Sequence, residues 1–428
     1  MATTPTIVVG RNNWGIKNGN LLGYYQSDDG FFVKREFTAT RGGGTNGTFV
    51  GSNGLIQTAA SGNLPRIDFT GGSPALLVEP SAQNAFIQSQ TLFTSHLVQN
   101  LTTAGYENVA VSPDGTQNAE KFVPNATNGV HGIADITSQT ITSGTTYTFS
   151  CFAKSDGGTN FPFISLTLDS STAWGATRNA IFNVVSGTIQ GSAPTGVTMR
   201  IENYGNGWYR FSATATAVGS ITGTYQYRIY IPNSSATLSY AAASGNTEGV
   251  LVWGVQVETG SVATSYIPTT TAPVTRNADV ISVTGFTDYI GQTEGTVYLE
   301  TNALVSGASD LFCFARATTN TVSISKNSSN IIQATVYTSG LTLNIAAPST
   351  VSGNVKIAVA YKTGDSALYI NGVQIGTSAT AFSFTAALTQ ININPTGFFE
   401  GSGNQRLRTL AIYNTRLSNT ELAALTIP

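Results

Sequence analysis

Four glutamates are the residues of this sequence that could do acid–base chemistry: Glu202, Glu258, Glu294 and Glu300. Two carboxylates on either side of a glycosidic bond can cleave it, and folding rather than sequence spacing brings such a pair together. The chain has only 22 acidic residues, so several must serve ordinary turns and ion pairs. Glu258 precedes a Thr-Gly turn, where we expect its carboxylate to accept hydrogen bonds from nearby backbone amides. We therefore predict no catalytic residue and a protein that is not an enzyme.

The sequence signatures of other catalytic and metal sites are absent. The two histidines, His96 and His131, form neither an HExxH nor an HxH pair, so zinc is unsupported. The chain also has no GxSxG nucleophile motif and no phosphate loop of the GxxxxGK[ST] type. Arg66 and Asp68 lie two apart on one strand face, with Glu79 nearby in sequence. An ion pair between short strands is the first interpretation of this trio, and an active site is the alternative.

A sugar site needs an aromatic ring for the apolar face of the sugar, with amides or carboxylates beside it for the hydroxyls. Trp174, in the polar stretch SSTAWGATRN, is the first candidate for such a ring, and Tyr337 is the second. Trp208 and Trp253 lie in strand-like patterns, so we expect both in a core. The sequence therefore predicts Trp174 and Tyr337 as glycan-binding residues.

Strands with one buried face must position these residues along 86–267. Apolar and polar side chains alternate there, which is the period of a half-buried strand. Tyr147 shares a strand face with Phe149, and Tyr227 shares a face with Ile229 in a later strand. Gly, Ser and Asn turns separate the strands, and no helical period is present. This pattern predicts an antiparallel β-sandwich of jelly-roll type.

A second sandwich is predicted for residues 292–428. Asn371-Gly372 separates ALYI from VQI, and this dipeptide accepts positive φ at both positions of a two-residue hairpin turn. One helix closes the chain from Asn419 to Leu425. Ser418 is its expected N-cap, and Glu421 three residues later completes a capping box.

The remaining segments contain too few apolar residues to fold by themselves. Residues 1–85 hold only short strand candidates among Gly and Asn, so we expect them to pack on a partner subunit or on another part of the chain, as an attachment and assembly region. Residues 268–291, with Pro268 and a threonine run, are expected to link the sandwiches. The predicted fold is all-β: an N-terminal region of short strands, two antiparallel β-sandwiches and one short C-terminal helix.

Composition excludes several classes of function. Charged residues make up 10% of the chain and the net charge is −2, so no basic field would attract nucleic acid or an anionic membrane. No run of about 18 apolar residues exists, so membrane insertion is not expected. The stretch Met1–Pro5 lacks the basic start and apolar core of a signal peptide. Cys151 and Cys313 lie in apolar strands of different predicted domains, which favours two buried thiols over a disulfide.

Four stretches carry a resemblance to a known family. They are NLPRIDFTGGSPALLVEPSAQN, SPDGTQNAEKF, GNGWYRFSATATA, and WGVQVETGSVATSYIPTT followed by VTRNADV. In this order they resemble bacteriophage virion-surface proteins: tail-fibre, head-fibre and receptor-binding subunits. In those proteins a carbohydrate-binding-module-like sandwich precedes a concanavalin A/laminin G-like one, and the final strand and helix of this chain resemble the end of the latter.

The resemblance implies a structural protein at the surface of a virion, with lectin-like domains that adhere to glycans of the host cell. It implies other virion proteins as partners and a homo-oligomer, which we expect to be a trimer because phage fibres commonly are. A purely structural head-decoration protein and a polysaccharide depolymerase are the alternatives.

Calcium enters only through this resemblance. Laminin G-like lectins often hold a calcium ion at a sandwich edge through carboxylate, amide and carbonyl oxygens. The oxygen donors near loops here are Asp310, Asp365, Asn371 and Asn394. They form no run that resembles a known calcium loop. We therefore predict no metal and no other cofactor, and Asp310 and Asp365 are the candidates if calcium binds.

Overall fold

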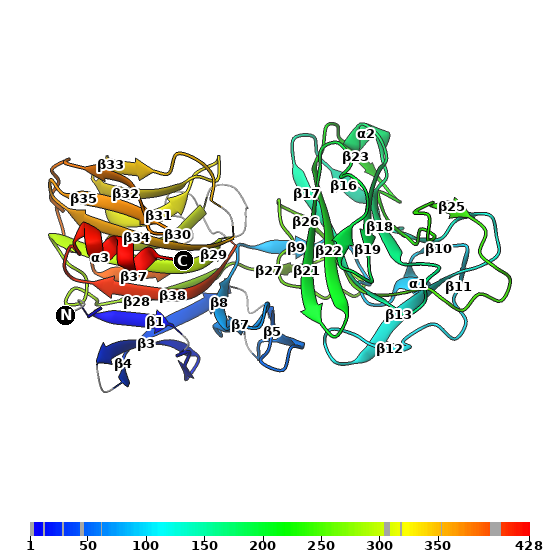
Figure 1. The fold of residues 1–428 in the computed structure, drawn as a ribbon, viewed down its shortest axis with the longest axis horizontal. Helices are drawn as coiled ribbons and strands as arrows, with labels where there is room; N and C mark the ends of the chain where they lie inside the picture. The colour runs from blue at the N-terminus through cyan, green and yellow to red at the C-terminus, as the bar shows by residue number, and fades with distance from the viewer. Residues whose placement is uncertain are drawn as a thin grey trace.

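The chain folds into two β-sandwiches that lie side by side, as the computed structural model shows (Figure 1). The structure describes residues 4–428 except 12, 28–29, 43–46, 61, 304–308, 317–318, 352 and 394–403. The predicted all-β class and the antiparallel pairing are confirmed. The helices are short: α1 (Leu92–Ser95), α2 (Ser171–Trp174) and α3 (Asn419–Thr426). None of the described helices has the length and hydrophobicity needed to span a membrane.

The sandwich from the middle of the sequence, which we call the middle sandwich, has two main sheets. The strand order of its first sheet is β10 (Leu97–Gln99), β15 (Gly132–Ala134), β24 (Tyr227–Tyr230), β18 (Phe163–Leu168), β19 (Arg178–Asn183) and β20 (Thr188–Ile189). The order of its second sheet is β11 (Leu101–Thr102), β13 (Gln117–Pro124), β26 (Val250–Thr259), β17 (Thr146–Ser155), β22 (Trp208–Thr216) and β21 (Val197–Gly205), and β12 (Ala110–Val111) pairs with β13. Short pairs join β14 (Gly129–Val130) to β25 (Ser239–Tyr240) and β16 (Gln139–Ile141) to β23 (Ile221–Gly223).

The other sandwich, which we call the terminal sandwich, draws strands from both ends of the chain. Its first layer runs β36 (Val373–Ser378), β35 (Ser366–Ile370), β34 (Asn354–Lys362), β29 (Glu294–Ala303) and β38 (Gln405–Tyr413), and β38 then pairs with both β1 (Ile7–Gly10) and β8 (Ala75–Val78). Beyond these lie β2 (Ile16–Lys17), β3 (Asn20–Ser27) and β7 (Arg66–Asp68). The second layer runs β4 (Gly30–Arg41), β28 (Asp279–Thr284), β37 (Gln390–Ile393), β30 (Ser309–Arg316), β31 (Asn320–Lys326), β32 (Ile332–Thr338) and β33 (Leu341–Ala346).

These pairings differ from the division expected from sequence. Residues 1–85 are not apart from 292–428, because β1 and β8 are hydrogen-bonded to β38, and β4 pairs with β28. Segment 268–291 is also more than a linker, since it contains β27 (Val274–Arg276) and β28. The physical reason is that the short N-terminal strands cannot bury a core alone and complete the sheets of the distant C-terminal segment. The middle sandwich is thus inserted between two halves of the terminal one.

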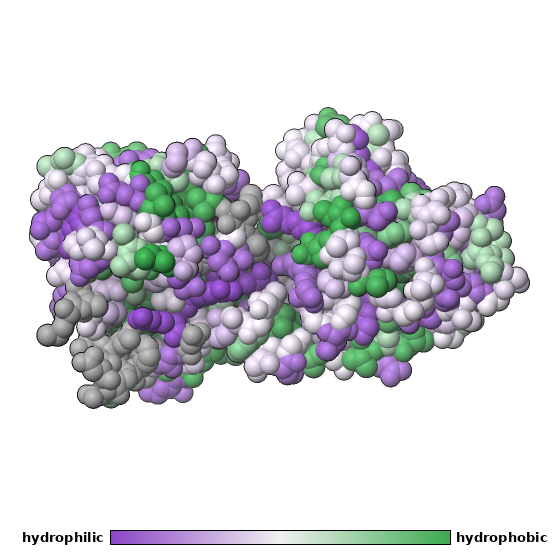
Figure 2. Space-filling view, viewed as in Figure 1, coloured by the Kyte–Doolittle hydropathy of each residue, from purple (hydrophilic) through white to green (hydrophobic). Residues whose placement is uncertain are grey.

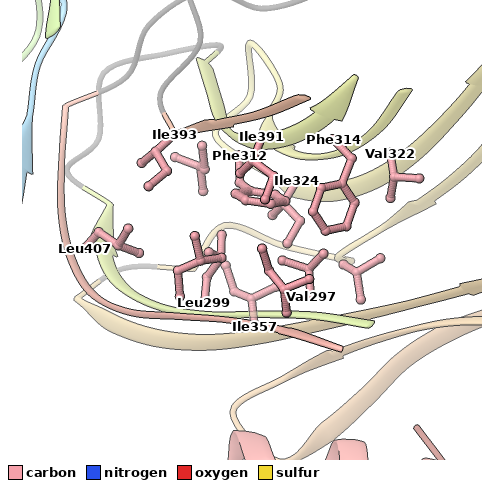
Figure 3. Close-up of a cluster of buried hydrophobic side chains, with 14 of the residues drawn as sticks. Val297, Leu299, Phe312, Phe314, Val322, Ile324, Ile357, Ile391, Ile393 and Leu407 are labelled. Atoms are coloured by element: carbon pink, nitrogen blue, oxygen red, sulfur yellow. The ribbon is translucent and has the colours of Figure 1, made fainter. Parts of the chain in front are cut away.

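Each sandwich encloses its own apolar core, because the alternating side chains of facing layers meet. In the terminal sandwich, Val297, Leu299 and Ile357 from the first layer face Phe312 and Phe314 from the second (Figure 3). The core of the middle sandwich includes Tyr147, Phe149, Tyr227 and Ile229, together with Cys151. Both cysteines are buried thiols outside any disulfide, as the sequence predicts.

Local predictions at the C-terminus are confirmed. Asn371 and Gly372 have φ of 50° and 81° and form the turn between β35 and β36. The Ser418 side chain caps α3, and Glu421 returns the hydrogen bond, so the capping box is complete. Leu417 and Leu422 are buried against the outer side of β34 and β35, so the helix covers that face.

Candidate functional site

A groove follows the strand pair of β9 (Ala82–Asn84) and β27, which lies where the chain passes between the two sandwiches (Figure 1). Its volume is about 550 Å³, within the range of about 300–1,000 Å³ typical of small-ligand sites. Hydrophilic residues gather across the junction of the two lobes on the surface (Figure 2). We call this site the tyrosine groove. Its lining is Ser81, Ala82, Gln83, Ala85, Gln139, Thr140, Tyr147, Tyr227, Val257, Glu258, Thr259, Pro273 and Thr275.

Asn84 fixes one wall of the groove. Its buried side-chain amide donates to the carbonyls of Val255 and Ile267, at 3.1 and 2.9 Å, and its Oδ1 accepts from the Val257 amide at 3.0 Å. These bonds hold β9 against β26 in the way a ladder of backbone hydrogen bonds would. Gln83, the residue before Asn84 on β9, has its side chain on the opposite face of the strand and lines the groove, where its Nε2 donates to Thr275 Oγ1 at 3.1 Å.

Two tyrosines form the floor of the groove. Tyr147 Oη accepts a hydrogen bond from the Thr142 amide at 2.9 Å, which leaves the tyrosine hydroxyl proton available to a ligand. Tyr227 is only 1% exposed, and its hydroxyl has no hydrogen-bond partner among the described residues. Burial raises the pKa of Tyr227, so its hydroxyl stays protonated. A buried hydroxyl without a partner costs free energy, and a polar ligand in the groove would remove that cost.

Trp174, the first candidate for a glycan-binding ring, lies behind these tyrosines and not at the surface, so its ring is not open to a sugar. The side chain is 3% exposed. Its ring meets Tyr147 edge-on at 6.0 Å between centroids and lies 6.4 Å from Tyr227. The polar sequence around Trp174 forms the short helix α2, capped by Ser170, and this turn directs the indole inward while its polar neighbours stay outside. Trp174 therefore supports the groove from within the core.

Gln139 also lines the groove, and its side-chain amide is fixed in place. Its amide nitrogen donates to the Ala85 carbonyl and to Asp135 Oδ2, both at 3.0 Å. Both partners are acceptors, which fixes the orientation of the amide and turns Oε1 the other way. Asp135 is held in turn by the Thr137 amide at 2.9 Å. Sequence reasoning missed Gln139 and Gln83, because a single glutamine in a strand carries no local signal.

The glutamates considered for acid–base chemistry are dispersed. Glu258 lines the groove, but both of its oxygens accept hydrogen bonds from Thr264, from the amide at 3.0 Å and from the hydroxyl at 2.5 Å. Burial raises the pKa of Glu258, and its role as a turn carboxylate is confirmed. Glu202 pairs with Arg406 at 3.5 Å, Glu294 pairs with Lys362 at 3.0 Å, and Glu300 lies on β29. Among its described lining residues, the groove has a single carboxylate, whereas glycoside cleavage requires two.

The other aromatic predictions fall outside the groove. Tyr337 is half-buried on β32 of the terminal sandwich, opposite Thr321, and does not join Trp174. Trp208 and Trp253 are in the core, as predicted, covered by Val50 and Ile56 from the hairpin of β5 (Thr48–Val50) and β6 (Ile56–Thr58).

No cluster of three His, Cys, Asp or Glu side chains that could hold a metal ion exists in the described part of the chain. Asp365 is a turn residue, paired with Arg416 at 2.8 Å. Asn371 Oδ1 accepts from the Lys356 amide at 2.9 Å within the hairpin. Asp310 lies on β30, but its side chain is outside the described part of the structure. Asn394 is outside the described residues altogether.

Two of the four stretches that carry the family resemblance, the one with Arg66 and Glu79 and the one with Arg276 and Asp279, meet at a buried charge cluster. Arg66 lies 2.8 Å from Glu79 and also pairs with Asp279. Arg41 lies 2.8 Å from Asp279, and Arg276 lies 3.6 Å from Glu79. Burial by itself would raise the pKa of Glu79, but Arg276 and Arg66 outweigh it and hold that pKa well below its usual range. Of the two interpretations of Arg66 and Glu79, the ion pair is therefore confirmed.

Asp68, the third member of that trio, pairs elsewhere. It lies 3.0 Å from Arg406, which also approaches Glu202 of the middle sandwich. Arg66 itself donates to Ser265 Oγ at 2.8 Å, and Ser265 donates to Glu79. These charges therefore tie the two sandwiches together.

Behind the groove lies a buried histidine that makes stability depend on pH. His96 packs on Phe86 at 4.5 Å between ring centroids, and its Nδ1 lies 3.7 Å from Asp135 Oδ1. Burial lowers the pKa of His96 from 6.5 to about 4. The unfolded chain therefore takes up this proton first as the pH falls, so the stability contributed by neutral His96 is complete above pH 6.5 and is lost between there and about pH 4.

Replacing His96 by phenylalanine should remove this loss. The free energy of unfolding of the variant, relative to the parent protein, is expected to grow by about 3 kcal/mol as the pH falls across that window. Urea unfolding at several pH values measures it. Glu120→Gln is a control of opposite sign, because burial raises the pKa of Glu120 from 4.5 to about 7 and its ionisation destabilises the fold as the pH rises. If the difference in the free energy of unfolding between each variant and the parent protein did not vary with pH, the shifted pKa values assigned to His96 and Glu120 would be wrong.

Comparison with known proteins finds likeness only to parts of the chain. No protein-family model matches, and no curated protein matches. A heptameric SAP-like pentraxin from Limulus polyphemus is 16% identical over 30% of this chain and 68% of its own, with a TM-score of 0.27. The CBM40 of Ruminococcus gnavus IT-sialidase is 16% identical over 32% of this chain and 85% of its own, with a TM-score of 0.29. A structure of botulinum neurotoxin type C, whose cell entry depends on interaction with two ganglioside molecules, is 16% identical over 35% of this chain and 39% of its own, with a TM-score of 0.28. Likenesses of this extent say nothing of what this chain binds.

Proposed function

We propose that this chain is a glycan-binding protein, and that the tyrosine groove is its binding site. The observation that carries the proposal is Tyr227, which lines the groove and whose buried hydroxyl has no partner among the described residues. Buried polar groups in proteins are nearly always paired, and a ligand hydroxyl in the groove would be one way to supply the missing hydrogen bond.

The remaining groove chemistry matches sugar hydroxyls. Each sugar hydroxyl donates one hydrogen bond and accepts others, so it suits a lining that mixes donors and acceptors. Tyr147 and Thr275 each have a hydroxyl whose oxygen already accepts a hydrogen bond, so the proton remains to donate. Gln139 offers a fixed carbonyl acceptor. Together with Tyr227 they would bind a diol from several sides.

The setting we propose is the surface of a bacteriophage particle, where the protein would adhere to glycans of the host cell. The support is the resemblance of four sequence stretches to fibre and receptor-binding subunits. Partners would then be other virion proteins and further copies of this chain, as a trimer. Many copies on one particle would multiply weak binding at each groove.

Tyr227→Phe tests the site, since it removes the hydroxyl and keeps the ring. We expect affinity for a bound glycan to fall about tenfold, while thermal stability stays level or rises because a buried unsatisfied group is gone. A glycan array and whole host cells identify the ligand, and titration calorimetry compares the variants.

Tyr369→Phe is the matched control. That hydroxyl is bonded to Gln374 Oε1 at 2.6 Å on the terminal sandwich, far from the groove in sequence and in the fold. Its loss should leave glycan affinity unchanged. If the purified protein binds neither cells nor glycans, the adhesion proposal fails and a head-decoration role takes its place. Shortened glycan products would favour a depolymerase instead.

A further inference from the structure

The tyrosine groove has no positive charge. No lysine, arginine or histidine is among its described lining residues, and its only acid is Glu258. The nearest arginine in sequence, Arg276, follows Thr275 but is buried and bonded to the Pro80 carbonyl at 3.0 Å and paired with Glu79. It cannot turn to meet a ligand without breaking those contacts.

One fixed polar group of the groove, the Gln139 amide, also disfavours an anion. Gln139 has both N–H groups committed to Ala85 and Asp135, so the group it presents is an acceptor. A carboxylate, sulfate or phosphate on a ligand is acceptor-only and would face this oxygen without a proton between them. Asp135 behind Gln139 adds negative charge on the same side.

We propose that the tyrosine groove selects neutral glycans over glycans that carry an acidic sugar. The inference rests on the proposed function, and it names the class of ligand. An acidic sugar would lose part of its hydration in the groove and find no counter-charge there, which is costly even when the loss is partial. A neutral sugar of the same size would lose only hydrogen bonds that the tyrosines, glutamines and threonines replace.

Matched pairs of oligosaccharides test the selection. Each pair shares one neutral core, and one member ends in a sialic or uronic acid. We expect the full-length protein to bind the neutral member at least about tenfold more tightly, because the acid is partly desolvated without a partner. The preference should change only slightly with salt concentration, since the effect comes from desolvation and contact more than from long-range charge.

Gln83→Lys supplies the missing cation. Gln83 is exposed at the rim, so a lysine there is compatible with the fold. The variant should bind the acidic member of each pair more tightly, which would reduce the preference for the neutral member several-fold. An unchanged preference in this variant, or equal binding of both members by the parent protein, would overturn the selection.

The outcomes separate the two proposals. If acidic members bind as well as neutral ones and Tyr227→Phe still weakens both, glycan binding at the groove stands and the selection for neutral glycans is wrong. If no member of any pair binds, the proposed function itself fails, and the selection fails with it.

Discussion

Arg66→Met is expected to lower the free energy of unfolding by about 4 kcal/mol, because it leaves buried carboxylates without their central partner. Arg66 is fully buried, lies 2.8 Å from Glu79 and also pairs with Asp279. It further donates to the Thr48 carbonyl at 2.7 Å and to Ser265 Oγ at 2.8 Å. Methionine fills much of the volume but replaces none of these bonds. Urea unfolding of both proteins at neutral pH measures the loss.

The pH dependence of that loss distinguishes charge from packing. In the parent protein, the depressed pKa of Glu79 contributes stability that is lost only as the pH falls below 4.5. In the variant, protonation relieves an unpaired charge, so the difference between the two proteins should narrow as the pH falls. Lys17→Ala is the control: its pair with Glu36 is 3.4 Å long, but the Lys17 side chain is 62% exposed. Breaking that exposed pair should cost less than about 1 kcal/mol. If Arg66→Met lowered the free energy of unfolding by as little as Lys17→Ala does, the buried charge cluster would not have the stabilising role proposed for it.

Trp174→Ala is expected to cost about 3–5 kcal/mol, which is the usual loss when a large buried aromatic side chain is removed. The indole is packed edge-on against Tyr147 and close to Tyr227, so its loss leaves a cavity directly behind the floor of the groove. Thermal or urea unfolding should show the change. Glycan affinity should fall as well, because the two tyrosines lose their support.

Trp174→Phe distinguishes two roles of the indole, which are packing behind the two tyrosines and direct contact with a glycan. A phenylalanine keeps most of the packing, so it should restore much of the stability and most of the glycan affinity. Tyr225→Ala, at an aromatic side chain that is 38% exposed, is the control and should cost under about 1 kcal/mol. A Trp174→Ala protein with unchanged stability and reduced affinity would mean that the indole contacts the ligand directly.

Local patterns were sufficient for several features of the fold. The period of two placed Tyr147 with Phe149 and predicted strands throughout. The Asn371-Gly372 turn and the Ser418–Glu421 capping box were read directly, since each depends only on residues within a few positions of one another. Such interactions survive in any fold that contains the segment, so sequence suffices for them.

Long-range pairing was beyond such patterns. Strand β1 pairs with β38, about four hundred residues later, and nothing in either strand marks the other. The segment before residue 85 therefore looked like a separate region, although its strands complete the terminal sandwich. A lone edge strand has many possible partners, and only the competition among all of them in the folded chain decides which pair forms.

The candidate site likewise has features that local sequence predicts and features that only long-range packing determines. From the sequence alone came the all-β class, the strands that bear Tyr147 and Tyr227, and the prediction that Arg66 and Glu79 pair. Only the tertiary structure decided that Trp174 is buried, that both tyrosines line one groove, and that Gln139 lines it too. The reason is that burial and hydrogen-bond partners depend on which surfaces come together. The polar stretch around Trp174 resembles a surface loop locally, but the packing of α2 on the core turns its one large apolar ring inward.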